Sequence, residues 1–146
     1  MKILFVCKYN RFRSRIAESY FNKINKNKKI IAKSAGIIKG SYPLDREEVE
    51  VAKQMGIKLS GKPQSLSTDL MIKVDLIIIV ADNVPRSIFN YNGYRGKVIV
   101  WRVKDVSDTE SKALIEKRIK KIMRKVRKFV KKLERKKAEL GHILGR

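Results

Sequence analysis

The amino-acid sequence predicts a small α/β domain, in which a doubly wound four-stranded parallel sheet carries helices on both faces. Short apolar runs alternate along the chain with segments of helical periodicity, and this order favours parallel pairing through right-handed crossovers. The apolar runs also lack a polar alternate face, which is typical of strands buried on both sides. The 146 residues, 43% of them hydrophobic, suit one core, and no repeat or linker divides them, so we expect a single domain over residues 1–146.

The first half of the chain is expected to form strand, helix, strand and helix in that order. Lys2–Val6 is a short apolar run, and Ser14–Lys26 has apolar residues at helical spacing. Lys29–Ala35 is the second apolar run. Leu44–Met55 fits a helix that ends before Gly56, since glycine commonly follows a helix.

The second half repeats this alternation and ends in a long helix. Asp69–Lys73 fits one short helical turn, and Asp75–Ala81, with IIIV at its centre, is the clearest buried strand. Asn83–Asn90 fits a short helix before the fourth strand, Lys97–Trp101. The remaining segment, 109–140, has helical periodicity throughout.

The last helix is expected to be amphipathic and strongly basic. From Glu110 to Arg146 there are 15 lysines and arginines against 4 glutamates, and the whole chain has a net charge of +22. Such a surface favours anionic partners, so non-specific contact of the helix (112–137) with nucleic acid or an anionic surface is one expectation. A merely solvated charged face is the alternative. An apolar stripe that should pack on the sheet comprises Ile115, Ile119, Ile122, Val126, Phe129 and Leu133.

Composition argues against several other classes of protein. The apolar runs, such as Leu76–Ala81, are too short to cross a bilayer, and the N-terminal run lacks the pattern of a signal peptide, so we expect a cytoplasmic protein without a transmembrane segment. One cysteine, Cys7, permits no internal disulfide. With His142 as the single histidine, the sequence predicts neither a metal site nor a cofactor.

A cysteine and an aspartate stand where ligands bind in sheets of this kind. Ligands of doubly wound sheets bind beyond the carboxyl ends of the strands. Cys7 follows the first apolar run, and Asp105 follows the fourth. These positions favour a functional role for Cys7 over that of a small buried hydrophobe, which is the ordinary role of a lone cysteine.

The stretch CKYNRFRS, from Cys7 to Ser14, has the composition of an anion-binding loop. If a helix starts near Ser14, free amide N–H groups converge on one point, and the helix dipole adds partial positive charge. Arg13 supplies a planar donor that matches two phosphate oxygens. A thiol in this field is expected to ionise, which makes Cys7 a candidate nucleophile beneath a bound oxyanion. The predicted phosphate-binding loop comprises Lys8, Tyr9, Asn10, Arg11, Phe12 and Ser14.

Two residues of this loop have candidate supporting roles. Asn10 tolerates a positive φ and can tie the loop with its side chain. Ser14 can cap the helix and donate its hydroxyl to the thiolate. Either residue alone would also fit ordinary turn chemistry.

The stretch FVCKYNRFRSRIAE, residues 5–18, resembles the active-site signature of low-molecular-weight protein-tyrosine phosphatases and the related arsenate reductases, in which C-x5-R-S lies between a strand and a helix. Ser34-Ala35-Gly36 resembles the segment after the second strand of that family. Residues 43–57 resemble its next helix, Val80–Asn83 is similar to the end of its third strand, and Trp101–Asp105 has the W-x-x-x-D spacing before its general acid.

This resemblance implies a cysteine phosphatase that hydrolyses phosphotyrosine or a related phosphomonoester through a phosphocysteine intermediate. Cys7 would be the nucleophile, Arg13 would bind the phosphoryl group, and Asp105 would be the general acid and then the base. Ser34 would support the site. Neither metal nor cofactor is implied, and the partner would be a phosphorylated protein or a small phosphomonoester.

The sequence departs from the family pattern at several positions. Asp105 is followed by valine instead of proline, so Asp108 is a rival for the acid, unless Ser107 and Glu110 form a capping box that opens the last helix. Tyr9 replaces the usual glycine, and either walls the pocket or packs on the surface.

Two further departures concern the cation and the cysteines of the loop. Arg11 adds a charge where the family often has a small or apolar residue, and either contacts acidic substrate flanks or is solvated. Phe12 stands where many of these phosphatases have a second cysteine, so a protective disulfide is impossible here.

Two other functions remain compatible with the sequence. An arsenate reductase-like enzyme would need an external thiol, since the chain has no further cysteine. A phosphatase-like scaffold that binds polyanions is the other alternative. Phosphotyrosine, phosphoarginine, a small phosphomonoester and arsenate all fit one oxyanion cradle.

Overall fold

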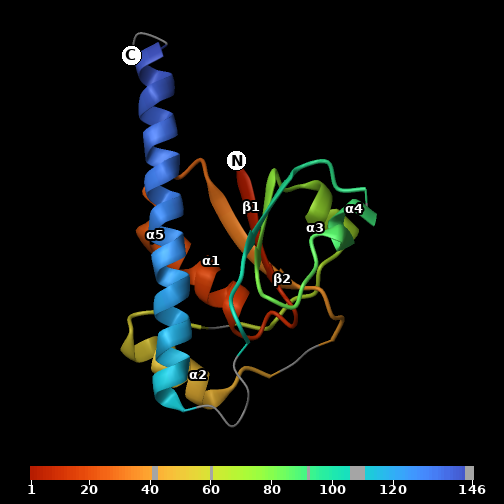
Figure 1. Cartoon of the computed structure of the whole chain (residues 1–146), viewed down its shortest axis with the longest axis vertical. Coiled ribbons are helices and arrows are strands. Elements are labelled where there is room, and N and C mark those ends of the chain that lie inside the picture. The colour runs from red at the N-terminus through yellow and green to blue at the C-terminus, as the bar shows by residue number, and fades with distance from the viewer. Residues whose placement is uncertain (41–42, 60, 92, 106–110, 144–146) are drawn as a thin grey trace.

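The computed structural model, shown in Figure 1, has one four-stranded parallel sheet with the strand order β2-β1-β3-β4. It describes residues 1–40, 43–59, 61–91, 93–105 and 111–143. The strands are β1 (Lys2–Cys7), β2 (Ile31–Gly36), β3 (Leu76–Val80) and β4 (Lys97–Trp101). The expected fold class is therefore confirmed, and the register places Cys7 opposite Gly36 at the carboxyl end of the sheet.

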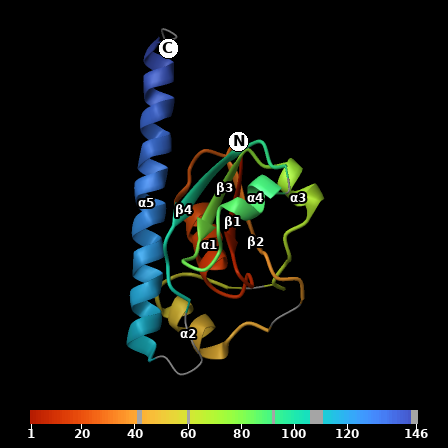
Figure 2. The same cartoon turned by 45° about the vertical axis from the view of Figure 1, so that its right-hand side comes forward.

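Helices cover both faces of this sheet (Figures 1 and 2). Helices α1 and α5 lie over one face and share a core with alternate strand residues such as Phe5 and Ile78. Helices α3 and α4 lie over the other face, where Val6 and Ile79 belong to a second core. Because both faces are covered, successive residues of the central strands are buried, from Ile3 to Cys7 in β1 and throughout β3, which explains the lack of alternation in their sequences. The edge strands β2 and β4 are less completely buried. The helices are α1 (Arg13–Ile24), α2 (Arg46–Gln54), α3 (Thr68–Ile72), α4 (Ser87–Tyr91) and α5 (Lys112–Ile143).

Local capping chemistry accounts for most differences from the expected helix bounds. Helix α2 begins at Arg46, not Leu44, because the Asp45 carboxylate accepts the Glu48 N–H and caps it. Helix α4 begins four residues later than expected, since Val84 precedes Pro85 and a residue before proline avoids the helical region.

The start of the last helix also differs from the expectation. Helix α5 begins at Lys112, and the Ser111 hydroxyl oxygen accepts the Leu114 N–H at 3.3 Å. Ser107 and Glu110 themselves lie outside the described residues.

The predicted apolar stripe of α5 is confirmed, although its main neighbours are helices. The helix packs chiefly on α1 and α2. It reaches the sheet through Phe129, whose ring centroid lies 6.0 Å from that of Trp101 in β4 and 6.0 Å from that of Phe21 in α1. Beyond Val130 the helix is mostly exposed, and its end extends past the sheet in Figure 1.

The exposed face of α5 is crowded with positive charge. Lys125 has a lowered pKa, because partial burial disfavours its charge and because Lys121, Lys128 and Arg124 repel it. Whether this face contacts an anionic partner stays a prediction. Among the helices that the structure describes, none combines the length and apolar character needed to cross a membrane.

We expect Lys125→Gln to raise the melting temperature slightly at neutral pH and low salt. The lowered pKa means that the folded chain binds this proton less tightly than the unfolded chain, so the charged lysine costs stability below its folded pKa. That cost disappears as the pH rises toward 10.5, where the lysine of the unfolded chain titrates. Glutamine removes the charge at similar helix propensity.

Thermal unfolding at low and high salt checks this expectation, since salt screens repulsion between exposed charges. Lys136→Gln, on the exposed end of the same helix, is the matched control. High salt should remove only the part of the gain that comes from repulsion by Lys121, Lys128 and Arg124, because it does not screen the cost of burial. A lower melting temperature for Lys125→Gln would contradict the explanation.

Candidate active site

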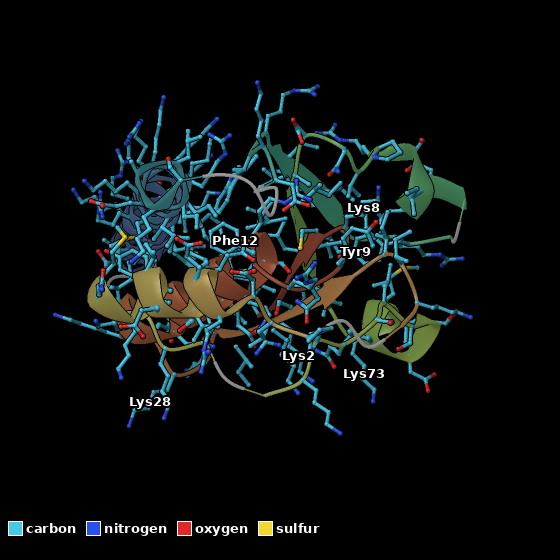
Figure 3. The ribbon with its side chains drawn as sticks, turned by 90° about the horizontal axis from the view of Figure 1, so that it is seen from below. Lys2, Lys8, Tyr9, Phe12, Lys28 and Lys73 are labelled. Atoms are coloured by element: carbon cyan, nitrogen blue, oxygen red, sulfur yellow. The ribbon has the colours of Figure 1, made fainter. Side chains whose placement is uncertain are left out.

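The candidate site lies where β1 ends, between its two neighbours β2 and β3. This is the point at which the strand order changes direction, and ligands of such sheets bind at its carboxyl edge. Figure 3 views the molecule from this end. Lys8 and Tyr9 lie together there, while Phe12 lies on the side of α5, in the core that α5 shares with α1.

Cys7 is the last residue of β1 and is buried, but it lines a pocket at this edge of the sheet. Its Sγ lies 3.0 Å from the Oγ of Ser14. The Ser14 Oγ accepts a hydrogen bond from the Asn10 side chain, which leaves its own O–H to be donated to the sulfur. Such a donor stabilises negative charge on the sulfur.

Asn10 holds the loop between β1 and α1 in shape. Its φ is 57°, in the left-handed region that asparagine tolerates better than most residues. The buried Asn10 amide donates to Ser14 Oγ at 2.8 Å and to Ser34 Oγ at 2.9 Å, and its oxygen accepts the Gln64 N–H at 2.9 Å. The expected side-chain hydrogen bonds of Asn10 are thus present, and they also reach Ser34 in β2 and the backbone of Gln64, both outside the loop.

Ser34 lies beneath the loop and does not line the pocket. It accepts from Asn10 and donates to the Glu18 carboxylate at 2.5 Å, so one hydroxyl links β2, the loop and α1. The Gln64 side chain donates to the Ser34 carbonyl at 2.6 Å. The sequence reasoning missed Glu18 and Gln64, because only the tertiary fold brings them to Ser34.

Gly36 lets the backbone of the loop at Tyr9 and Asn10 pack directly against β2. A Cβ at this position would lie 2.6 Å from the Tyr9 carbonyl carbon and 2.7 Å from the Asn10 nitrogen. Real Cβ atoms do not approach so closely, so a side chain here would displace the loop backbone. The neighbouring Ile37 and Ile38 N–H groups bond to the Cys7 and Lys8 carbonyls and hold the loop against β2.

Arg13 lies beside Cys7 with its side chain 1% exposed. Its Nη1 donates to the Val103 carbonyl at 2.9 Å and lies 3.6 Å from Asp82 Oδ1. Its Nη2 lies 3.4 Å from Asp105 Oδ2. The buried Nε–H has no hydrogen-bond partner among the described residues. Nε and Nη2 therefore remain as a two-pronged donor for an oxyanion.

The two carboxylates near Arg13 occupy different positions. Asp105 lines the pocket with Cys7, whereas Asp82 lines a separate surface depression. The sequence reasoning did not select Asp82, although its place just after the third strand puts it at the same edge. Asp108, the rival acid, lies outside the described residues.

The remaining predicted loop residues divide between the pocket and its surroundings. Tyr9, Arg11 and Phe12 line the pocket, together with Glu48 of α2, which the sequence reasoning missed. Lys8 does not line it, and its amine lies 5.2 Å from the centroid of the Tyr9 ring. A buried guanidinium, a thiol and a carboxylate thus meet in one pocket, a set that can bind an oxyanion, attack it and transfer a proton.

We expect Gly36→Ala to weaken inorganic phosphate binding and to lower stability by about 1–3 kcal/mol, the usual cost of forcing extra volume into a packed site. Calorimetric titration with phosphate and chemical unfolding measure the two effects. Gly141→Ala is the control, because nothing lies within 4 Å of a Cβ built at Gly141. Wild-type phosphate affinity in Gly36→Ala would show that the loop does not depend on this contact.

Comparisons with known proteins agree on one family. Residues 2–139 match a family model described as low molecular weight phosphotyrosine protein phosphatase. No curated protein sequence matches the chain significantly.

Solved structures of this fold resemble the chain over most of its length. A low molecular weight protein tyrosine phosphatase from T. tengcongensis is 29% identical with a TM-score of 0.73, and covers 90% of this chain and 99% of its own. An arsenate reductase from Archaeoglobus fulgidus is 25% identical with a TM-score of 0.69, over 88% and 98%. The YwlE arginine phosphatase from Geobacillus stearothermophilus is 16% identical with a TM-score of 0.81, over 94% and 96%, a likeness of fold alone.

Proposed function

Because this chain belongs to the low molecular weight phosphotyrosine protein phosphatase family, we propose that it hydrolyses phosphotyrosine or a related phosphomonoester through a phosphocysteine on Cys7. The observation that carries the proposal is the meeting of Cys7, Arg13 and Asp105 in one pocket. The substrate would be a phosphorylated protein or a small phosphomonoester. We place the enzyme in the cytoplasm, where reducing conditions keep a lone thiol free.

In the first step, the Cys7 thiolate attacks phosphorus as the ester P–O bond breaks. The protonated carboxyl of Asp105 donates its proton to the leaving oxygen, which departs as an alcohol or phenol. The Arg13 Nε and Nη2 donors and the loop amides stabilise the charge on the transferring phosphoryl group. The product of this step is a phosphocysteine and an Asp105 carboxylate.

In the second step, water takes the place of the leaving group. The Asp105 carboxylate accepts a proton from the water, whose oxygen attacks phosphorus while the S–P bond breaks. Phosphate leaves, and Cys7 returns to the thiolate that the Ser14 hydroxyl stabilises. Asn10 and Ser34 act as positioning residues in both steps, because they fix the loop that carries Ser14 and the amides.

Arsenate reduction is the second candidate, and the likeness to the Archaeoglobus fulgidus arsenate reductase favours it. Reduction requires two electrons, which this chain would have to take from an external thiol because Cys7 is its single cysteine. Phosphate ester hydrolysis requires no such reductant and is the simpler assignment.

We expect Cys7→Ser to abolish hydrolysis of an aryl phosphate while it leaves inorganic phosphate binding largely intact. Serine keeps the shape of the pocket but is a far weaker nucleophile without a general base beside it. Steady-state assays with and without EDTA, together with phosphate titration, measure both properties, and EDTA should change neither. Full turnover by the variant would refute the mechanism. No turnover by the wild type, with nucleic-acid binding that falls steeply with salt, would favour a polyanion-binding scaffold.

We expect Asp105→Asn to lower kcat for an aryl phosphate by roughly 10²–10⁴-fold, the usual contribution of a positioned acid. The loss should be smaller for esters of acidic phenols, whose leaving oxygens need little protonation. Asp108→Asn is the matched control and should retain most activity. The reverse result, a large loss in Asp108→Asn and a small one in Asp105→Asn, would assign the acid to Asp108.

A further inference from the structure

We propose that Arg11 makes this site selective for phosphotyrosine with acidic neighbours and against phosphoarginine. The inference rests on the proposed phosphatase function and adds the substrate class to it. The residues that carry it form the mouth of the pocket above Cys7: Tyr9, Arg11 and Glu48, with Lys8 beside them.

Arg11 is held at the mouth of the pocket by a neutral partner. Its Nε donates to the Pro43 carbonyl at 3.0 Å, in the segment that leads into α2. This bond fixes the guanidinium between the loop and that segment, and a neutral carbonyl does not compensate its charge. Among the described residues no carboxylate forms an ion pair with Arg11, although Glu48 and Asp105 line the same pocket.

The other charges of the pocket do not cancel that of Arg11. Asp105 lies 3.4 Å from Arg13, so its charge is directed to the buried guanidinium. Glu48 is only 7% exposed, whereas Arg11 is partly exposed. The Asp105 side chain is 41% exposed, but it already lies beside Arg13, so Arg11 is the partly exposed charge of this pocket that has no ion-pair partner among the described residues. An acidic side chain next to the phosphorylated residue can supply the missing counter-charge.

Tyr9 and Lys8 extend this surface beside the scissile phosphate. The Tyr9 ring lines the pocket and offers an aromatic wall to a phenyl leaving group, and the Lys8 amine lies 5.2 Å from its centroid. A phosphotyrosine ring packed on Tyr9 would thus lie near two cations, Arg11 in the pocket lining and Lys8 beside the Tyr9 ring, and both favour acidic flanks. The aromatic wall and the two cations together favour a phosphotyrosine whose neighbouring residues are acidic.

Phosphoarginine fits the same mouth poorly. Its guanidino group lies directly next to the phosphoryl group and carries positive charge, so it would approach the Arg11 guanidinium. Like charges brought together at a partly desolvated site oppose binding. The shared fold with an arginine phosphatase therefore does not carry its substrate to this chain.

The test compares kcat/KM for two phosphotyrosine peptides of equal length, one with glutamate and one with glutamine on both sides of the phosphotyrosine. We expect wild type to prefer the glutamate peptide by roughly three- to fivefold, the size expected of a partly exposed ion pair, and to lose this preference in high salt. Arg11→Gln should reduce the ratio to about one, Arg11→Glu should invert it, and Arg11→Lys should restore part of it.

Lys73→Gln is the matched control, because Lys73 is an exposed lysine ahead of β3, at the opposite end of the sheet. It removes one charge and should keep the wild-type ratio. A phosphoarginine peptide should be cleaved far more slowly than either phosphotyrosine peptide by wild type, and relatively better by Arg11→Glu.

The possible outcomes distinguish failure of the selectivity proposed here from failure of the proposed phosphatase function. Equal rates for both phosphotyrosine peptides in wild type, or a preference that Arg11→Gln retains, overturn the role of Arg11 and leave the phosphatase assignment intact. Faster cleavage of phosphoarginine than of phosphotyrosine overturns the substrate class. Hydrolysis of no phosphorylated peptide and no aryl phosphate overturns the proposed function together with this inference.

Discussion

The buried Arg13 guanidinium is the constraint on which the geometry of the site depends. A cation with a 1% exposed side chain must be compensated by nearby acceptors, and its partners come from the segments after β3 and β4. One side chain from the start of α1 therefore ties three strand ends together. Its distances of 3.6 Å to Asp82 and 3.4 Å to Asp105 exceed those of tight charged hydrogen bonds, about 2.7–2.9 Å, so the charge is available to a substrate oxyanion.

The loop that precedes Arg13 is held in shape by contacts with Ser34 and Gly36 of β2 and with the backbone of Gln64. Asn10 adopts a left-handed conformation, and its side chain donates to Ser14 and Ser34 and accepts the Gln64 N–H. Gly36 lets the loop backbone approach β2 more closely than any side chain would permit. The side chains of Asn10 and Ser34 are buried and hydrogen-bonded, whereas Lys8, Tyr9 and Arg11 are partly exposed. The buried contacts thus fix the shape of the loop, and the partly exposed residues beside it can vary without disturbing that shape.

Much of this arrangement could be predicted from the sequence, because it follows from local rules. Apolar runs without alternation indicate buried parallel strands, and a cysteine at the end of one of them lies at the ligand-binding edge. Asn10 and Ser14 were identified by their own turn and capping chemistry. Asp82, Glu18, Gln64 and Glu48 were not, because only the packing of distant segments brings them to the loop. The start of α4 was misplaced because Pro85 outweighs the helical pattern around it.

The most direct test of this account is to ask where the phosphoryl group goes during turnover. Asp105→Asn slows the hydrolysis of the intermediate more than its formation from an ester with an acidic phenol, so a rapid acid quench of that variant should trap it. Mass spectrometry of the digested protein should then find one phosphoryl group on the peptide that contains Cys7. A phosphoryl group on another residue, or turnover with no phosphorylated enzyme, would contradict the central role of Cys7.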